Sequence, residues 1–287
     1  MYTSHFQLRE NPFSLTPDPK YLFLSRQHRE ALHHLIYGIK EKKGFIVITG
    51  GIGTGKTTLS RTLLAGMDPS VETALIFNSY LSDMELLEVI NQEFKVSLVG
   101  VDRSKRRYID SLNAFLMSNH KAGKNAVVLI DEAQNLSRNV LEQIRMLSNL
   151  ETETEKLLQI ILVGQPELRD LLAQPSLKQL NERISVRYHL DGLSGDDVPD
   201  YIEHRLTVAG DTGHLKFADD AYGKIFDFSR GNPRRINILC DRAMLIAYAG
   251  NLLEIDRKVV KLAVKDLKSS DVKKGTFFAR ARKGLFA

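Results

Sequence analysis

A glycine-rich segment beginning at Gly50 has the composition of a phosphate-binding loop. It fits the pattern G-x-x-x-x-G-K-[ST], and it stands between an apolar run (FIVIT) and a helical pattern (TTLSRTLL). Glycines allow backbone N–H groups to wrap phosphates, and a helix N-terminus adds a favourable dipole. Lys56 would bridge the β- and γ-phosphates, and the Thr57 hydroxyl would hold Mg²⁺. We therefore expect ATP and Mg²⁺ as cofactors, with the loop contributing Gly50, Gly51, Ile52, Gly53, Thr54, Gly55, Lys56, Thr57 and Thr58.

Two adjacent carboxylates, Asp131 and Glu132, follow the apolar run VVLI. A strand that ends in this pair would present both at the carboxyl edge of a sheet, beside the phosphate loop. Asp131 would bind Mg²⁺ through water, and Glu132 would polarise the attacking water as general base. Acidic residues also often begin helices, so the pair is informative only together with the upstream loop. Asn78 closes an earlier strand, where it would either hold Glu132 in an inactive orientation or mark a solvated strand end.

Three further positions suit a set of γ-phosphate sensors. Gln165, just after the run IILVG, would orient the water, or it simply begins a helix. Arg183 stands before SVRYHL, where the nucleotide of a neighbouring subunit would receive it as an arginine finger. Arg187 competes for that role, and a surface salt bridge is the alternative for both. Arg234 opens a helix and would fold down on the phosphates, with Arg235 as its competitor.

The elements that must position these residues alternate between strands and helices. Short apolar or β-rich runs predict strands at 45–49, 74–78, 126–130, 159–164 and 185–190. Helical patterns fall at 57–66, 83–94, 107–121, 137–149 and 166–181. Near-continuous apolar runs favour strands that are covered on both faces, as in a parallel sheet. We therefore expect a doubly wound α/β fold of the P-loop NTPase type.

The pattern changes at the two ends of this region. Residues 1–24 are rich in proline and aromatic residues and predict an irregular arm, followed by a helix at 25–42. After about residue 191 only helical patterns remain, over 194–267, which predicts a smaller α-helical domain. We expect an arm and helix at 1–43, the ATPase core at 44–191, a helical lid at 192–267 and a basic tail at 268–287. Some aromatic or proline residues of the arm would line an adenine pocket or cover a sheet edge: Pro12, Phe13, Tyr21 and Phe23.

Composition and charge indicate the cellular compartment in which the chain works and the surfaces that it could bind. The single cysteine, Cys240, excludes an internal disulfide, lies in an apolar-periodic stretch and fits a reducing cytosol. We expect a soluble chain, because the sequence has no secretory signal and no apolar run of about 18 residues. Residues 257–287 hold ten basic and two acidic residues, so the rest of the chain has a net charge of about −3. This tail is either a flexible end or a segment attracted to anionic lipid or nucleic acid.

The motifs together resemble those of the ExeA/general secretion pathway protein A family of AAA+ ATPases. The resemblance runs from residue 1 to about 267 and rests on NPFSLTPDPKYLFLSRQHREAL, LIYGI, TGGIGTGKTT, LIDEAQNL, RMLSNLET, ILVGQPELRDLL, LNERISVRYHL and GNPRRIN. Gly51 departs from the family, in which an acidic residue is common at that place. The resemblance implies a Walker A role for Lys56 and Thr57 and a Walker B role for Asp131 and Glu132. It implies that Gln165 is sensor 1, Arg183 the arginine finger and Arg234 sensor 2.

The resemblance also implies a cellular role. It implies a homo-oligomeric ATPase at the cytoplasmic face of the bacterial inner membrane, which works with a peptidoglycan-binding partner to assemble an outer-membrane secretin. In the family a membrane helix and a periplasmic domain follow, and such a helix would start near residues 283–287. Pilus-biogenesis, exopolysaccharide-linked and sorting-linked ATPases are similar over this region. More distantly similar ATPases bind DNA and regulate transposition, but residues 1–256 have no basic excess that would favour nucleic acid.

Overall fold

The computed structural model describes residues 2–77, 79–97, 104–153 and 155–269. Contacts divide the chain into two compact units. The sheet unit contains residues 26–52 and 56–191, and the helical unit contains residues 1–25, 53–55 and the chain from residue 192. The arm therefore clusters with the C-terminal part of the chain, and the helix that follows the arm clusters with the sheet.

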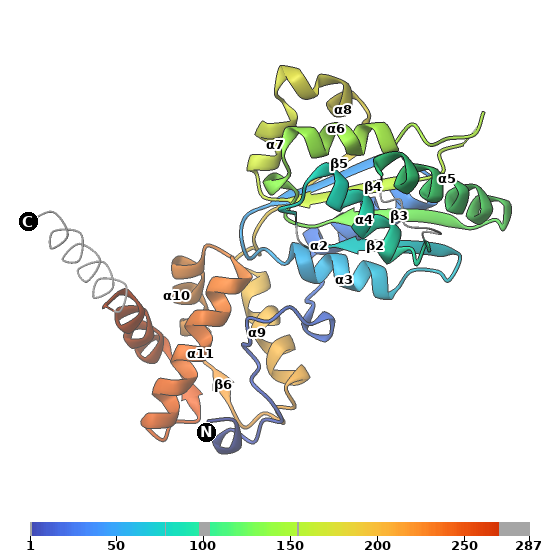
Figure 1. Cartoon of the computed structure of the whole chain (residues 1–287). Coiled ribbons are helices and arrows are strands. Elements are labelled where there is room, and N and C mark those ends of the chain that lie inside the picture. The colour runs from blue at the N-terminus through green and yellow to red at the C-terminus, as the bar shows by residue number, and fades with distance from the viewer. Residues whose placement is uncertain (1, 78, 98–103, 154, 270–287) are drawn as a thin grey trace, which may run out of the picture. The chain divides into compact units, whose positions relative to one another are not determined.

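The sheet unit is built on five parallel strands (Figure 1). They are β1 (Phe45–Gly50), β2 (Val71–Ile76), β3 (Asn125–Ile130), β4 (Gln159–Gly164) and β5 (Ile184–Leu190), in the spatial order β2-β3-β4-β1-β5. This confirms the expected parallel α/β fold. Strand β4 lies between β1 and β3, so the carboxyl ends of these three strands are neighbours at one edge.

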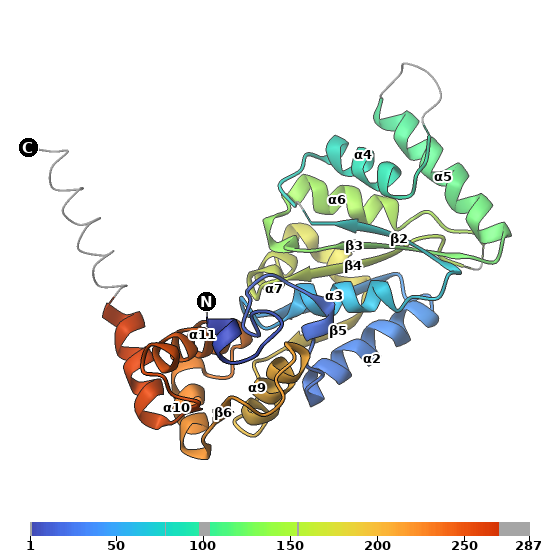
Figure 2. The ribbon, with the colours of Figure 1, turned by 90° about the horizontal axis from the view of Figure 1, so that it is seen from below.

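Helices cover both faces of this sheet (Figure 2). Helices α2 (Arg26–Lys40) and α3 (Lys56–Ala65) lie on one face. Helices α4 (Asp83–Glu93), α5 (Lys105–Lys121) and α6 (Arg138–Leu147) lie on the other. Strands β1, β3 and β4 are buried almost throughout, as their continuous apolar runs predict.

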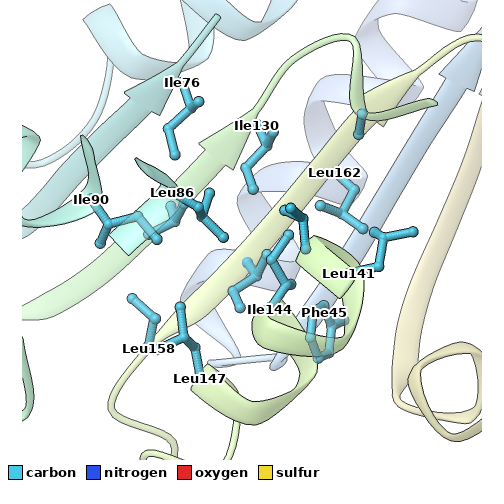
Figure 3. Close-up of a cluster of buried hydrophobic side chains, with 14 of the residues drawn as sticks. Phe45, Ile76, Leu86, Ile90, Ile130, Leu141, Ile144, Leu147, Leu158 and Leu162 are labelled. Carbon is cyan, nitrogen blue, oxygen red and sulfur yellow. The ribbon is translucent and has the colours of Figure 1, made fainter. Parts of the chain in front are cut away.

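The core between the sheet and α4 and α6 is formed by alternate strand residues. Phe45 and Val47 of β1 belong to it, as do Val128 and Ile130 of β3. Leucine and isoleucine side chains of α4 and α6 pack against them (Figure 3). This close packing fixes the strands and therefore the loops at their carboxyl ends.

The helix expected at 166–181 is wrong as a single element. The chain instead forms α7 (Glu167–Leu172), the 3-10 turn η3 (Pro175–Leu177) and α8 (Lys178–Glu182). The break occurs because proline disfavours a helical conformation in the residue before it, and Gln174 is extended (φ −61°, ψ 140°).

The helical unit contains α9 (Asp197–Val208), α10 (Asp219–Ser229), α11 (Pro233–Ala249) and a helix over 257–269. It also contains two short parallel strands, β6 (Lys216–Phe217) and β7 (Glu254–Ile255). The expectation of helices alone was therefore wrong at these four residues, because two-residue strands are too short to leave an alternating pattern. Cys240 is fully buried in this unit, and burial raises the pKa of its thiol, as expected for a core residue.

The arm is part of the core of the helical unit. It contains α1 (Tyr2–His5) and the turn η1 (Pro19–Tyr21). The Phe13 ring meets Phe217 edge-on at 6.2 Å, and Phe23 meets Tyr201 in the same way at 5.9 Å.

Buried Arg205 of α9 fastens the arm. Its guanidinium donates to the carbonyl oxygens of Pro12 and Ser14 and lies over the Tyr21 ring. Phe13 and Tyr21 are only 2% and 6% exposed, so these two rings are engaged within this unit rather than available to an adenine base.

Candidate nucleotide site

The glycine-rich loop joins the end of β1 to the start of α3. The Lys56 ammonium is turned into the loop, where it donates to the carbonyl oxygens of Gly50 and Gly51 at 2.8 and 2.9 Å. Lys56 is 6% exposed. Burial lowers the pKa of this ammonium, while the charges of Glu132 and Asp131 act in the opposite direction. The sequence-predicted lysine and both carboxylates therefore share one electrostatic environment.

The backbone of the loop needs glycine at two positions. Gly53 and Gly55 have φ values of 79° and 98°, which glycine adopts without steric strain. Thr57 and Thr58 follow in the first turn of α3. The predicted loop residues thus span a strand end, a tight turn and a helix start, which is the arrangement that phosphate binding requires.

Thr57 and Asp131 form a pair of oxygen ligands. The Thr57 hydroxyl donates to Asp131 Oδ2 at 2.7 Å, and Asp131 is 2% exposed. Mg²⁺ prefers oxygen ligands and is usually bound by one or two side chains together with water and substrate phosphates. The donor set of this pair therefore fits Mg²⁺, and binding of the ion stays a prediction.

The backbone of Glu132 is left-handed (φ 51°, ψ 37°). Its N–H donates to Asp131 Oδ1 at 2.9 Å, and its carbonyl oxygen accepts from the buried Ser79 hydroxyl at 2.8 Å. A left-handed conformation at a residue other than glycine costs free energy and tends to occur at functional sites. Here the neighbouring side chains stabilise it and so set the direction of the Glu132 side chain.

Two glutamine amides bind the Glu132 carboxylate. Its Oε2 accepts from Gln165 Nε2 at 3.0 Å and from Gln134 Nε2 at 2.6 Å. Burial tends to raise the pKa of this carboxyl group, but both amide hydrogen bonds and the Lys56 charge outweigh burial and lower it. Glu132 is therefore ionised at neutral pH, as a general base must be.

The strand order explains why these residues meet. Lys56 and Thr57 follow β1, Asp131 and Glu132 follow β3, and Gln165 follows β4, which lies between them. Sequence analysis missed Ser79 and Gln134, although Gln134 lies within the segment LIDEAQNL. Asn78, for which the sequence left open a contact with Glu132 or a solvated strand end, lies outside the described residues.

The predicted finger, Arg183, is attached to the end of α6. Its Nη1 donates to the Ser148 hydroxyl at 2.7 Å and to Asn149 Oδ1 at 2.5 Å. Its competitor Arg187 donates to the backbone and side-chain oxygens of Asn181, both at 2.7 Å. Both guanidinium groups thus have partners within their own unit.

The predicted sensor Arg234 is the second residue of α11, in the helical unit. Its action on the phosphates stays a prediction, as does the finger role of Arg183.

Comparison of the sequence with known proteins identifies relatives of this chain. A family model for an AAA domain matches residues 39–172. General secretion pathway protein A of Aeromonas hydrophila is 46% identical over 263 residues, which are 92% of this chain and 48% of that protein. The chain thus spans about half the length of this relative.

Two solved structures show the same fold at low identity. Cdc6p of Pyrobaculum aerophilum is 17% identical, with a TM-score of 0.65 over 89% of this chain and 70% of that one. The RuvB Holliday junction branch migration motor of Thermotoga maritima is 17% identical, with a TM-score of 0.57 over 85% and 69%. Within the AAA+ ATPases, the chain belongs to the family of general secretion pathway protein A.

Proposed function

We propose that this chain binds ATP with Mg²⁺ and hydrolyses it to ADP and phosphate. The observation that carries the proposal is the Glu132 carboxylate, which two amides hold in the site that also contains Lys56 and the Thr57–Asp131 pair. A site that only bound a nucleotide would not need a base oriented in this way.

Each residue has a distinct role in this proposal. Lys56 would hold the β- and γ-phosphates, while Thr57 and Asp131 would hold Mg²⁺, which when bound would neutralise charge on the phosphate oxygens. The Glu132 carboxylate accepts a proton from the attacking water, and Gln165 orients that water. These roles follow from the chemistry of the side chains and their convergence at one edge of the sheet.

Two substitutions test the proposal. Lys56→Ala should abolish ATP binding, because it removes the phosphate clamp. Glu132→Gln should retain ATP binding and abolish turnover, because it removes the base and keeps the side-chain volume. Binding of a fluorescent ATP analogue and release of phosphate measure the two effects. Turnover by Glu132→Gln at the native rate would refute the assignment of the base.

We infer further that the chain acts as a homo-oligomer at the cytoplasmic face of a bacterial inner membrane. There, ATP turnover would drive or switch the assembly of a type II secretin or a pilus, together with a peptidoglycan-binding partner. The name and 46% identity of the Aeromonas relative support this role. The basic residues after 256 would favour an anionic membrane surface, although residues 270–287 lie outside the described residues. No described helix meets the length and apolarity needed to cross a membrane.

A genetic replacement tests the cellular role. In the native host, Glu132→Gln introduced at the chromosomal locus should reduce the secretin or pilus in the outer membrane, with the protein level unchanged. The alternative is an ATP-dependent DNA-binding regulator. It predicts ATP-dependent binding of labelled duplex DNA by the purified chain and normal secretin and pilus assembly in the same strain.

A further inference from the structure

Gln134 lies at the centre of the hydrogen-bond network around Glu132. It is the middle residue of the 3-10 turn η2 (Ala133–Asn135), directly after the acidic pair. Its Nε2 donates to Glu132 Oε2 at 2.6 Å, and its Oε1 accepts from the backbone N–H of Gln165 at 2.9 Å. One side chain therefore connects the loop after β3 with the loop after β4.

The chemistry of its partners fixes the orientation of this amide. An ionised carboxylate only accepts hydrogen bonds, and a backbone N–H only donates them. The NH₂ group of Gln134 must therefore face Glu132, and its oxygen must face Gln165. A rotated amide would place its oxygen against the Glu132 carboxylate, so that two acceptors face each other, and its NH₂ group against the Gln165 N–H, so that two donors face each other.

The backbone of β4 leaves room for this amide. A Cβ atom at Gly164 would lie 2.8 Å from Gln134 Oε1 and 2.9 Å from Leu168 Cδ2. The close approach of the Gln134 oxygen to the end of β4 thus depends on glycine at this position.

The two amides make the two carboxylate oxygens of Glu132 inequivalent. Gln134 and Gln165 both donate to Oε2, and neither donates to Oε1. Oε2 is therefore occupied by neutral donors that stabilise its negative charge. Oε1 is then the oxygen that would meet the attacking water of the proposed hydrolysis.

We propose that Gln134 is a positioning residue for hydrolysis, which fixes the Glu132 carboxylate and holds Gln165 beside it. This inference rests on the proposed ATPase function. It assigns the final residue of the segment DEAQ a role distinct from those of the Asp and Glu that begin it.

The substitution Gln134→Met tests the inference. It keeps the length of the side chain and removes both the donor and the acceptor. We expect ATP binding within about threefold of native and turnover reduced by about tenfold or more. Near-native ATP binding with reduced turnover would separate a loss of positioning at Glu132 from a loss of the nucleotide site. Turnover at the native rate would overturn the inference.

Two companion variants make the test specific. Gln134→Glu keeps the side-chain length but cannot donate to Glu132, so its turnover should fall at least as far as that of Gln134→Met. Gln92→Met makes the same substitution at an exposed glutamine of α4 that donates to Glu88. It should leave ATP binding and turnover at the native level.

A measurement without turnover separates this inference from the proposed function. Crystal structures of the native chain and of Gln134→Met show directly where the Glu132 carboxylate lies. A carboxylate that loses its hydrogen bond to Gln165 in Gln134→Met supports the inference, and an unchanged Glu132–Gln165 hydrogen bond overturns it whether or not the protein hydrolyses ATP. A native chain that releases no phosphate overturns the proposed function and with it the catalytic role of Gln134, but the crystal structures still decide whether Gln134 holds the carboxylate.

Discussion

Lys56 and Glu132 respond differently to burial within one site. Burial lowers the pKa of the Lys56 ammonium, and nearby carboxylates only partly oppose that effect. Glu132 is also partly buried, yet two amides and the Lys56 charge hold its pKa below the ordinary value. Each charge therefore stabilises the other, and the hydrogen bonds to Glu132 decide that its pKa is lowered despite burial.

The Thr57 hydroxyl gives a prediction at the scale of one atom. Thr57→Val keeps the shape of the side chain and removes the oxygen that bonds Asp131. Thr57→Ser keeps the oxygen. We expect Thr57→Val to need at least about tenfold more Mg²⁺ for half-maximal ATP binding, because one of two side-chain oxygen ligands is lost. Thr57→Ser should stay close to native.

A magnesium titration of fluorescent-nucleotide binding measures this difference. Identical titration curves for Thr57→Val and the native chain would show that Thr57 does not hold the metal ion.

The sequence was enough to predict which charged and hydroxyl side chains lie together here, but it did not predict the hydrogen bonds around them. Lys56, Thr57, Asp131 and Glu132 follow from residue types at fixed spacing. The role of Gln134 does not, because its contact with Gln165 exists only once β3 and β4 are paired. The left-handed backbone of Glu132 could not be predicted either, since it depends on contacts with Ser79 and Asp131.

At the scale of elements, Gly164 sets how closely β4 and η2 approach. Gly164→Ala would place a methyl group against the Gln134 oxygen and the Leu168 side chain. Overpacking of this kind costs about 1–3 kcal/mol. We therefore expect lower stability in urea-induced unfolding, together with slower turnover.

Gly223→Ala is the matched control. Gly223 lies exposed within α10, and no atom lies within 4 Å of an added Cβ beyond its own helix and neighbours. Alanine there should be neutral or stabilise by up to about 1 kcal/mol. Equal unfolding of Gly164→Ala and the native chain would mean that the strand and turn can separate without cost.

Secondary structure was predictable where the hydrophobic pattern is long. All five strands of the sheet and the helices on its faces follow from apolar runs and helical periods, but β2 begins at Val71, three residues before the predicted start at residue 74. The interruption at Pro175 was missed because apolar residues continue on both sides of it. Strands β6 and β7 were missed because their pairing joins residues that are distant in sequence.

At the scale of the whole molecule, the proposed role of Arg183 as an arginine finger predicts that each nucleotide site is completed by a neighbouring subunit. Arg183→Ala and Glu132→Gln should each bind ATP and hydrolyse little. A mixture of the two should regain measurable turnover, because an intact Glu132 can receive Arg183 from a neighbouring subunit. An arginine finger is worth about 10³-fold or more in turnover.

Phosphate release by the mixture at several protein concentrations is the measurement. Arg183 would have to leave Ser148 and Asn149 to act in this way. If the mixture stays inactive while both variants assemble, Arg183 serves to anchor α8 on α6, and Arg187 becomes the next candidate.

The arm predicts an effect of the N-terminal residues on the stability of the helical unit. Phe13→Ala removes a ring that is 2% exposed and should cost about 3–5 kcal/mol in the urea-induced unfolding of this unit. Leu15→Ala, at an arm residue that is 48% exposed, should cost less than about 0.5 kcal/mol. Equal costs would mean that the arm is not part of the core.

The same arm affects the order in which the chain folds during synthesis. Phe6 and Phe13 leave the ribosome before their partners in α9, β6 and α11, which follow only after the entire sheet unit. At about 5–20 residues per second, these aromatic side chains wait on the order of ten to forty seconds for their core. The sheet unit can fold in that interval, whereas the helical unit cannot. A nascent chain that stalls before residue 193 would therefore present an arm with unburied aromatic side chains to the chaperones and proteases of the cell.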